Sequence, residues 1–154
     1  MHAHIEPIIL VEDDVNDVFF VRHALETARI QNPLSVFASA EQAREYLRLQ
    51  RSMLGPVLVI LDLDLAGAET GLDVLQWIRD QPEPLGSTPA LILSGSDRQQ
   101  DRDDSHRLGA MTYLQKPVTE ESLTRAVQAL GFVIVTNLTS GQLAVRIIER
   151  RCSR

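Results

Sequence analysis

Five short, strongly apolar runs alternate with longer segments of helical periodicity, and this alternation constrains the fold more than any other feature. The runs are rich in Val, Ile and Leu and carry almost no polar residue, which is typical of strands buried on both faces. Strands of this kind, each followed by a helix, predict an α/β domain with a parallel sheet between two layers of helices. The expected strands are residues 8–11, 34–37, 57–61, 90–93 and 111–114.

The segments between these runs predict the helices. Apolar residues recur at helical spacing over 16–29 and 71–79, and residues 97–108 are expected to form a very polar helix. Ser39 and Thr119 are suitable N-cap residues for two further helices. Ser122 follows Thr119 at the place where a capping box has Glu or Gln, so that box is expected to be incomplete.

Length and charge narrow the class of protein. A chain of 154 residues fits one domain with a sizeable core. Its formal net charge of −6 argues against nucleic acid as a partner, and the single cysteine, Cys152, argues against a disulfide framework and fits a reducing compartment. The sequence starts without a secretory leader, so we expect a cytoplasmic protein.

One uncharged segment, residues 126–145, is about as long as a membrane span. Gly131, Gly141 and several polar residues interrupt it, so a membrane location is not expected. We expect instead a buried helix that continues into a tail facing a partner.

Polar side chains gather where the expected strands end. Glu12, Asp13 and Asp14 follow the first strand, and Asp62 and Asp64 follow the third. The carboxyl ends of parallel strands form the usual site edge of such sheets. Clustered carboxylates repel one another without a cation, and oxygen ligands suit Mg²⁺. Taken singly, each of these acids is more typical of a loop or a helix cap.

Two further groups reach the same edge. Ser94 follows the fourth strand, and Lys116 comes after the fifth. A hydroxyl and an ammonium group can bind phosphoryl oxygens, and a carboxylate can attack phosphorus to form an acyl phosphate. The residues therefore predict Mg²⁺-assisted phosphoryl transfer onto or past an aspartate.

This combination resembles the receiver domain of two-component response regulators, of the CheY-like, stand-alone type. The motifs are Glu12-Asp13, Leu-Val-Ile-Leu-Asp-Leu ending in Asp62 and Leu63, Leu-Ile-Leu-Ser with Ser94, and Lys116 before a usually cis proline. The resemblance implies a flavodoxin-like (βα)5 fold with a doubly wound parallel five-stranded sheet in the order 2-1-3-4-5. The implied receiver domain spans residues 5–138, and residues 139–154 form a C-terminal tail or arm.

The resemblance also implies a role for each residue. Asp62 would accept the phosphoryl group, with Lys116 and Ser94 on its oxygens and Tyr113 as the aromatic switch residue. Mg²⁺ would be held by Glu12, Asp13 and Asp62 and by the backbone carbonyl of Asp64. Movement of Ser94 would let Tyr113 turn inward and change the surface of the fourth helix, fifth strand and fifth helix.

The implied protein is a phosphoacceptor in signalling, and it would catalyse only its own phosphorylation and dephosphorylation. Its partner would be a sensor histidine kinase or a phosphotransfer protein. No effector domain has room to follow the receiver, so the output would be a change in partner binding.

The end of the chain carries a weaker likeness. Residues 133–138 resemble the tail of stand-alone receivers of the phytochrome-associated kind. Residues 139–154 combine four arginines with aliphatic residues, which fits an arm that packs on a second subunit in a homodimer. A frayed tail is the alternative.

Other classes explain less of the pattern. Asp62-x-Asp64 after a strand also resembles the nucleophile motif of haloacid-dehalogenase-type phosphatases and the metal site of topoisomerase-primase domains. The phosphatase motif usually lies on the first strand and is followed by small residues, whereas here it lies on the third strand and Leu65-Ala66 follows. The topoisomerase-primase reading leaves Ser94 and Lys116-Pro117 unexplained. A pseudo-receiver that binds without phosphorylation would not need the full set of residues.

The loop after the third expected strand departs from the common receiver pattern, with Ala66-Gly67 in place of Pro-Gly.

Overall fold

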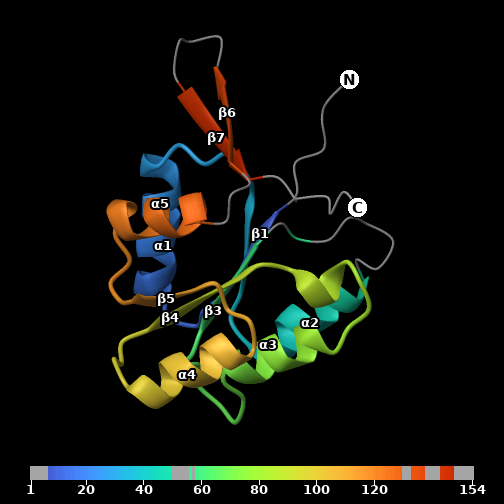
Figure 1. Ribbon diagram of the computed structural model, residues 1–154. Helices are drawn as coiled ribbons and strands as arrows, with labels where there is room; N and C mark the ends of the chain where they lie inside the picture. The colour runs from blue at the N-terminus through green and yellow to red at the C-terminus, as the bar shows by residue number, and fades with distance from the viewer. Residues whose placement is uncertain (1–6, 50–55, 57, 130–132, 138–142, 148–154) are drawn as a thin grey trace.

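The computed structural model describes residues 7–49, 56, 58–129, 133–137 and 143–147. A five-stranded parallel sheet lies between two layers of helices (Figure 1). The strand order is β2-β1-β3-β4-β5, which confirms the predicted flavodoxin-like fold. The strands are β1 (Ile8–Val11), β2 (Leu34–Phe37), β3 (Leu58–Asp62), β4 (Ala90–Ser94) and β5 (Thr112–Gln115).

The helices follow the strands in strict alternation. Several boundaries differ from the sequence prediction by one or two residues. The fourth helix begins two residues later, and both Asp62 and Ser94 still belong to their strands. A short 3-10 turn, Leu85–Ser87, lies in the proline-rich segment before β4. The helices are α1 (Val15–Thr27), α2 (Ala40–Leu49), α3 (Gly71–Arg79), α4 (Gln99–Arg107) and α5 (Glu120–Ala129).

The core consists of two apolar clusters, one on each face of the sheet. Alternate residues of each strand point to opposite faces, so Ile8 and Leu10 join one cluster and Ile9 and Val11 join the other. Helices α1 and α5 cover the first face, and α2 and α3 cover the second. The central strands β1 and β3 are buried along their whole length, which explains their uninterrupted apolar sequences.

Side-chain caps fix where several helices begin. Asp14 is the N-cap of α1, where its carboxylate accepts a hydrogen bond from Asn16 N. Thr70 and Asp73 form a capping box at α3. At α5 the predicted incomplete box is closed after all, because Ser122 Oγ accepts from Thr119 N while Thr119 Oγ1 accepts from Ser122 N.

Over residues 126–145 the sequence predicted a buried helix that continues into a tail, and the structure has two further strands after that helix. Helix α5 ends at Ala129, and strands β6 (Val133–Asn137) and β7 (Leu143–Ile147) form an antiparallel hairpin. Four successive residues from Val133 to Thr136 are β-branched, which favours a strand over a helix. In Figure 1 this hairpin projects from the domain at the opposite end from α4. Within the described residues, no helix is long and apolar enough to cross a membrane.

Candidate functional site

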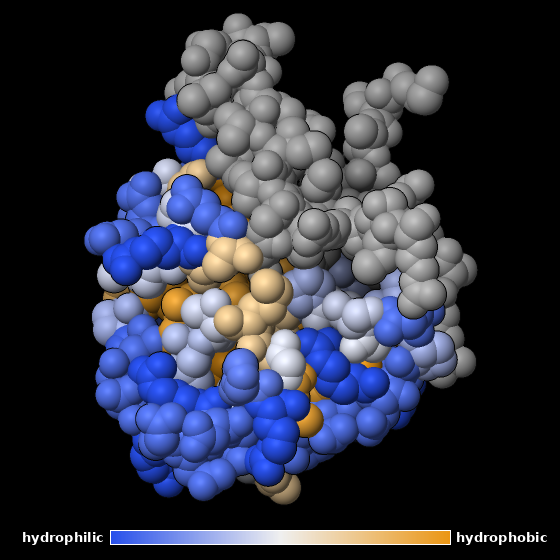
Figure 2. Space-filling model, in the orientation of Figure 1, coloured by the Kyte–Doolittle hydropathy of each residue, from blue (hydrophilic) through white to orange (hydrophobic). Residues whose placement is uncertain are grey.

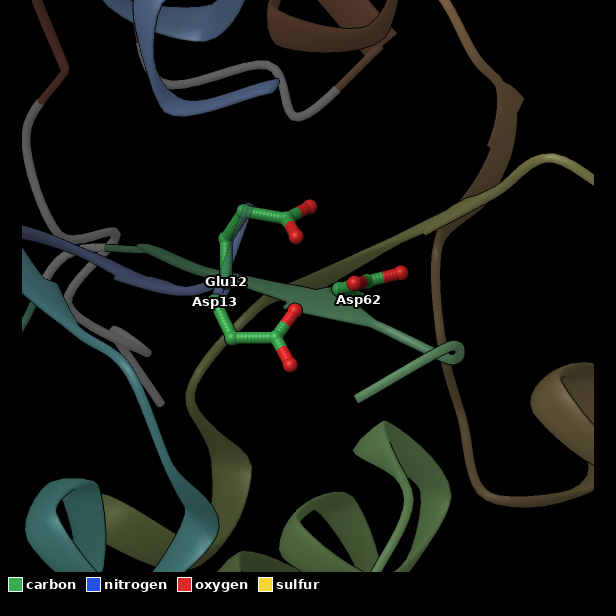
Figure 3. Close-up of side chains that lie close together, drawn as sticks. All are labelled: Glu12, Asp13 and Asp62. Atoms are coloured by element: carbon green, nitrogen blue, oxygen red, sulfur yellow. The ribbon is translucent and has the colours of Figure 1, made fainter. Parts of the chain in front are cut away.

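Three carboxylates meet at the carboxyl ends of β1 and β3. Glu12 and Asp13 directly follow β1, and Asp62 is the last residue of β3 (Figure 3). These strands are direct neighbours in the sheet, with Val11 paired to Leu61, so their ends coincide. One oxygen from each of the three carboxylates lies within 4.8 Å of the others. The parallel register therefore brings together two acidic motifs that are far apart in sequence.

Two of these carboxylates are buried. Glu12 and Asp62 are each 1% exposed, whereas Asp13 is partly open to solvent. Burial is the main reason that the pKa of Glu12 rises to about 8, and its hydrogen bond with Asp62 raises it further. Asp62 Oδ2 is buried and has no hydrogen-bond partner among the described residues. Such an arrangement is costly unless a further partner binds there.

Lys116 lies among the carboxylates. Its Nζ is 2.9 Å from Glu12 Oε2, 2.9 Å from Asp17 Oδ2 and 3.0 Å from Asp62 Oδ1. Burial by itself lowers the pKa of this ammonium group, but the hydrogen bonds to the three carboxylates outweigh burial and raise the pKa. Lys116 therefore stays charged and partly offsets the repulsion within the cluster. The Lys116–Pro117 peptide bond is cis.

Asp17 is a member of the site that the sequence reasoning missed. It lies in the first turn of α1, and its carboxylate accepts a hydrogen bond from Lys116 Nζ. The sequence signal that could have found Asp17 is its spacing, because it lies about one helical turn after the acidic run and can face the same side. Asp14, whose role was open, instead caps α1 with its side chain.

Asp64 and Ser94 meet across the edge between β3 and β4. Ser94 Oγ donates to Asp64 Oδ2 at 3.3 Å, and Gly95 N donates to the same oxygen at 3.1 Å. Asp64 N donates to Asp62 Oδ1 at 2.9 Å. Sequence reasoning used only the backbone carbonyl of Asp64, but its side chain also holds the segment that follows β4.

The loop after β3 is tied to the acidic cluster at two points. Asp13 Oδ2 accepts a hydrogen bond of 2.7 Å from Ala66 N. Gly71, the first residue of α3, packs so closely on β3 that an added Cβ would lie 2.3 Å from Asp62 O. Only glycine fits there, so Gly71 belongs to the framework of the site, although its sequence context marks it only as a helix start.

Tyr113 contacts the loop that follows β4 and not the carboxylates. It is half-buried in β5 and packs against the second apolar cluster. Its hydroxyl donates to Ser96 O at 2.8 Å. The residues predicted for the site therefore form two groups: the carboxylates with Lys116, and the Ser94–Asp64 pair with Tyr113 farther along the loop.

The chemistry of the first group fits a hard divalent cation. The donors are carboxylate oxygens, and one buried oxygen, on Asp62, lacks a partner. Mg²⁺ binds through one or two carboxylates and keeps several waters, so partly open access beside Asp13 suits it. Glu12, Asp13 and Asp62 could hold such an ion.

Known proteins share both the sequence pattern and the fold. Residues 8–128 match the response regulator receiver domain family. A probable methanogenesis regulatory protein, FilR2, of Methanothrix harundinacea (strain 6Ac) is 30% identical over 127 residues, which are 80% of this chain and 79% of the relative.

Two solved structures show the likeness in three dimensions. The bacteriophytochrome response regulator RtBRR is 32% identical with a TM-score of 0.76, and the match covers 90% of this chain and 85% of that one. The Mn²⁺-bound form of response regulator Rcp1 is 28% identical with a TM-score of 0.66, covering 79% of this chain and 88% of that one. The family match spans most of the sequence and includes every residue of the acidic cluster. The chain belongs to the response regulator receiver family and is a CheY-like signalling domain.

Proposed function

We propose that this protein accepts a phosphoryl group on Asp62. The observation that carries the proposal is the buried carboxylate of Asp62, which has one oxygen bound to Lys116 and Asp64 N and the other without a hydrogen-bond partner among the described residues. The free oxygen is the nucleophile. It would form a P–O bond as the P–N bond of a phosphohistidine on the donor breaks and the imidazole leaves.

The neighbouring residues support that step. Glu12, Asp13 and Asp62 would hold Mg²⁺, with the Asp64 carbonyl as a further ligand. When bound, Mg²⁺ offsets the negative charge of the phosphoryl oxygens and of the clustered carboxylates. Lys116 would exchange part of its contact with the carboxylates for a phosphoryl oxygen. Ser94 would donate its hydroxyl to the phosphoryl group in place of Asp64.

The output of this reaction is a change of binding surface. The Ser94–Asp64 contact holds the start of the β4–α4 loop, and Tyr113 holds Ser96 in the same loop. Transfer of the Ser94 hydroxyl to the phosphoryl group would shift this loop and alter the α4-β5-α5 face. The donor would be a sensor histidine kinase or a phosphotransfer protein, and we propose that the chain acts in the cytoplasm.

The direct test uses a small-molecule donor. Incubation with Mg²⁺ and acetyl phosphate should add one phosphoryl mass to the intact chain, and chelation of the metal should prevent it. Asp62→Asn should abolish the addition, whereas Asp80→Asn, an exposed aspartate at the end of α3, should not. Equal labelling of Asp62→Asn and the natural chain would overturn the proposal, as would release of bulk phosphate from unrelated esters.

We also propose that the C-terminal arm mediates a homodimer. The support is the hairpin of β6 and β7, which projects from the domain (Figure 1). Each of its two strands pairs only with the other, so the outer edge of each could pair with a further strand. An isolated two-stranded hairpin is marginally stable in water, so a partner surface would stabilise it. Removal of the residues after 138 deletes β7 and should convert a dimer to a monomer in light scattering. An unchanged mass would contradict the role of the arm without bearing on Asp62.

A further inference from the structure

The face between α4 and β5 contains a contact that the proposed phosphoryl chemistry does not use. Arg102, in the middle of α4, places its guanidinium over the ring of Tyr113, with Cζ 4.6 Å from the ring centroid. This is within the distance at which a cation is attracted to the face of an aromatic ring. The ring therefore has a charged group on one face, while its hydroxyl is bonded to Ser96 O.

Arg102 is itself held in place. Its Nε donates to Asp97 Oδ1 at 2.9 Å, and Asp97 directly follows Ser96, the residue that Tyr113 binds. The guanidinium thus bridges the ring and the loop that the ring contacts. Loop, ring and helix form one closed set of contacts made by Ser96, Asp97, Arg102 and Tyr113.

The contact lies at the surface. A hollow of about 320 Å³ between α4 and β5 is lined by Arg102, Tyr113, His106 and Met111, among others. Helix α4 is almost entirely polar, and the surface over it is hydrophilic (Figure 2). A tyrosine ring that left the loop would have this open hollow beside it. Apolar packing from α4 therefore does little to hold Tyr113 in its observed position.

We propose that Arg102 is a positioning residue that holds the switch tyrosine, Tyr113, against the β4–α4 loop before phosphorylation. In the observed state Ser94 is still bonded to Asp64, yet Tyr113 is already half-buried and bonded to the loop. We call the contacts of Arg102 with the ring and with Asp97 the clasp, and the position of the ring bonded to Ser96 O the inner position. The clasp keeps the ring in the inner position without help from Ser94. The α4–β5 face therefore already has, before phosphorylation, the tyrosine position that we assign to the partner-binding form.

This inference rests on the proposed function, because it assigns the inner position of Tyr113 to the phosphorylated form. If the phosphorylated form requires the inner ring, a residue that favours this position also favours phosphorylation. Loss of the clasp should release the ring and weaken the binding of a phosphoryl analogue. Because Arg102 is partly exposed, we expect a loss of affinity of about two- to fivefold, within the range of a cation–π contact.

The ring can be observed directly. We would replace Tyr46 with Phe, so that Tyr113 is the only remaining tyrosine, and label it with 3-fluorotyrosine. In 19F NMR, Arg102→Gln should move the ring signal toward that of an exposed tyrosine, and Arg102→Lys should restore it in part. Arg107→Gln removes an equal charge and an ion pair with Asp104 from the same helix, and it should leave the signal unchanged.

Titration with beryllofluoride and Mg²⁺ tests the coupling. Arg102→Gln should weaken binding about two- to fivefold in the natural background and should have no effect in a Tyr113→Leu background. An equal loss in both backgrounds, or the same loss in Arg107→Gln, would show a general charge effect and overturn the inference. An unmoved ring signal would also overturn it. Failure of the natural chain to bind beryllofluoride would instead count against the acceptor role of Asp62.

Discussion

Two partly buried cations lie at opposite ends of β5, and they have opposite surroundings. Arg79, the last residue of α3, donates to four backbone carbonyls at the amino ends of β4 and β5, those of Gly86, Thr88, Leu108 and Gly109. Lys116, at the carboxyl end of β5, contacts three carboxylates. Burial lowers the pKa of Arg79, whereas carboxylate contacts raise the pKa of Lys116.

The difference separates a cation bound to neutral backbone groups from a cation bound to charged side chains, and we propose a functional role only for the second, Lys116. The carbonyls around Arg79 belong to the backbone and carry no net charge, and through them this arginine ties α3 to two loops. The carboxylates around Lys116 carry negative charge that a metal ion can share, and one oxygen of Asp62 is left over. Burial of a charge does not by itself mark a site, but exchangeable partners do.

The largest effect on stability should come from Arg79. Arg79→Met would keep most of the aliphatic contact but leave four carbonyls without their donor, and we expect a loss of about 3 kcal/mol in the free energy of unfolding. Addition of Mg²⁺ should not restore the free energy of unfolding that Arg79→Met loses. Urea denaturation with and without Mg²⁺ measures the loss of stability and the effect of the metal on it. The control is Arg125→Met, which removes an exposed ion pair with Glu121 on α5 and should cost less than about 0.5 kcal/mol. A small effect of Arg79→Met would remove the contrast between the two cations.

A smaller effect, and one that depends on metal, is expected at Lys116. Lys116→Met leaves Glu12 and Asp62 together without their shared cation, which should destabilise the metal-free chain by about 2 kcal/mol. Mg²⁺ replaces the lost positive charge, so it should stabilise this variant more than the natural chain. An identical loss with and without Mg²⁺ would show that Lys116 is as purely structural as Arg79.

The smallest effect concerns pH. The pKa of Glu12 is raised in the folded chain from 4.5 to about 8, so the folded state binds more protons than the unfolded state between these values. The contribution of Glu12 is therefore fully present at low pH and is lost as the pH rises through about 8. In this window the stability of the metal-free chain should fall as the pH rises. Thermal unfolding of Glu12→Gln beside the natural chain checks this, since the variant should show a flatter pH dependence.

Much of the fold follows from local patterns in the sequence. Fully buried strands such as β1 and β3 carry uninterrupted apolar runs, and the helices carry periodic ones, so both could be predicted almost to the residue. The hairpin of β6 and β7 could not, because an uncharged segment of that length is compatible with a helix or with strands. Its β-branched residues were the signal that favoured strands.

The site was predictable where a residue directly follows a strand. Glu12, Asp13, Asp62, Ser94 and Lys116 all lie at strand ends, and strand order alone brings them to one edge. Asp17 and Arg102 lie inside helices, and their roles depend on which way each helix turns its side chains. The side-chain bond from Ser94 to Asp64 likewise depends on loop geometry that no local pattern specifies.

The central claim is that one carboxylate of the acidic cluster, that of Asp62, receives the phosphoryl group. Acetyl phosphate labelling followed by borohydride reduction converts a phosphorylated aspartate to homoserine, which peptide mass spectrometry can locate. We expect homoserine at position 62 and at no other acidic position, only when Mg²⁺ is present. Homoserine at position 13 or 64 would contradict the account, as would an unmodified chain under conditions that bind Mg²⁺.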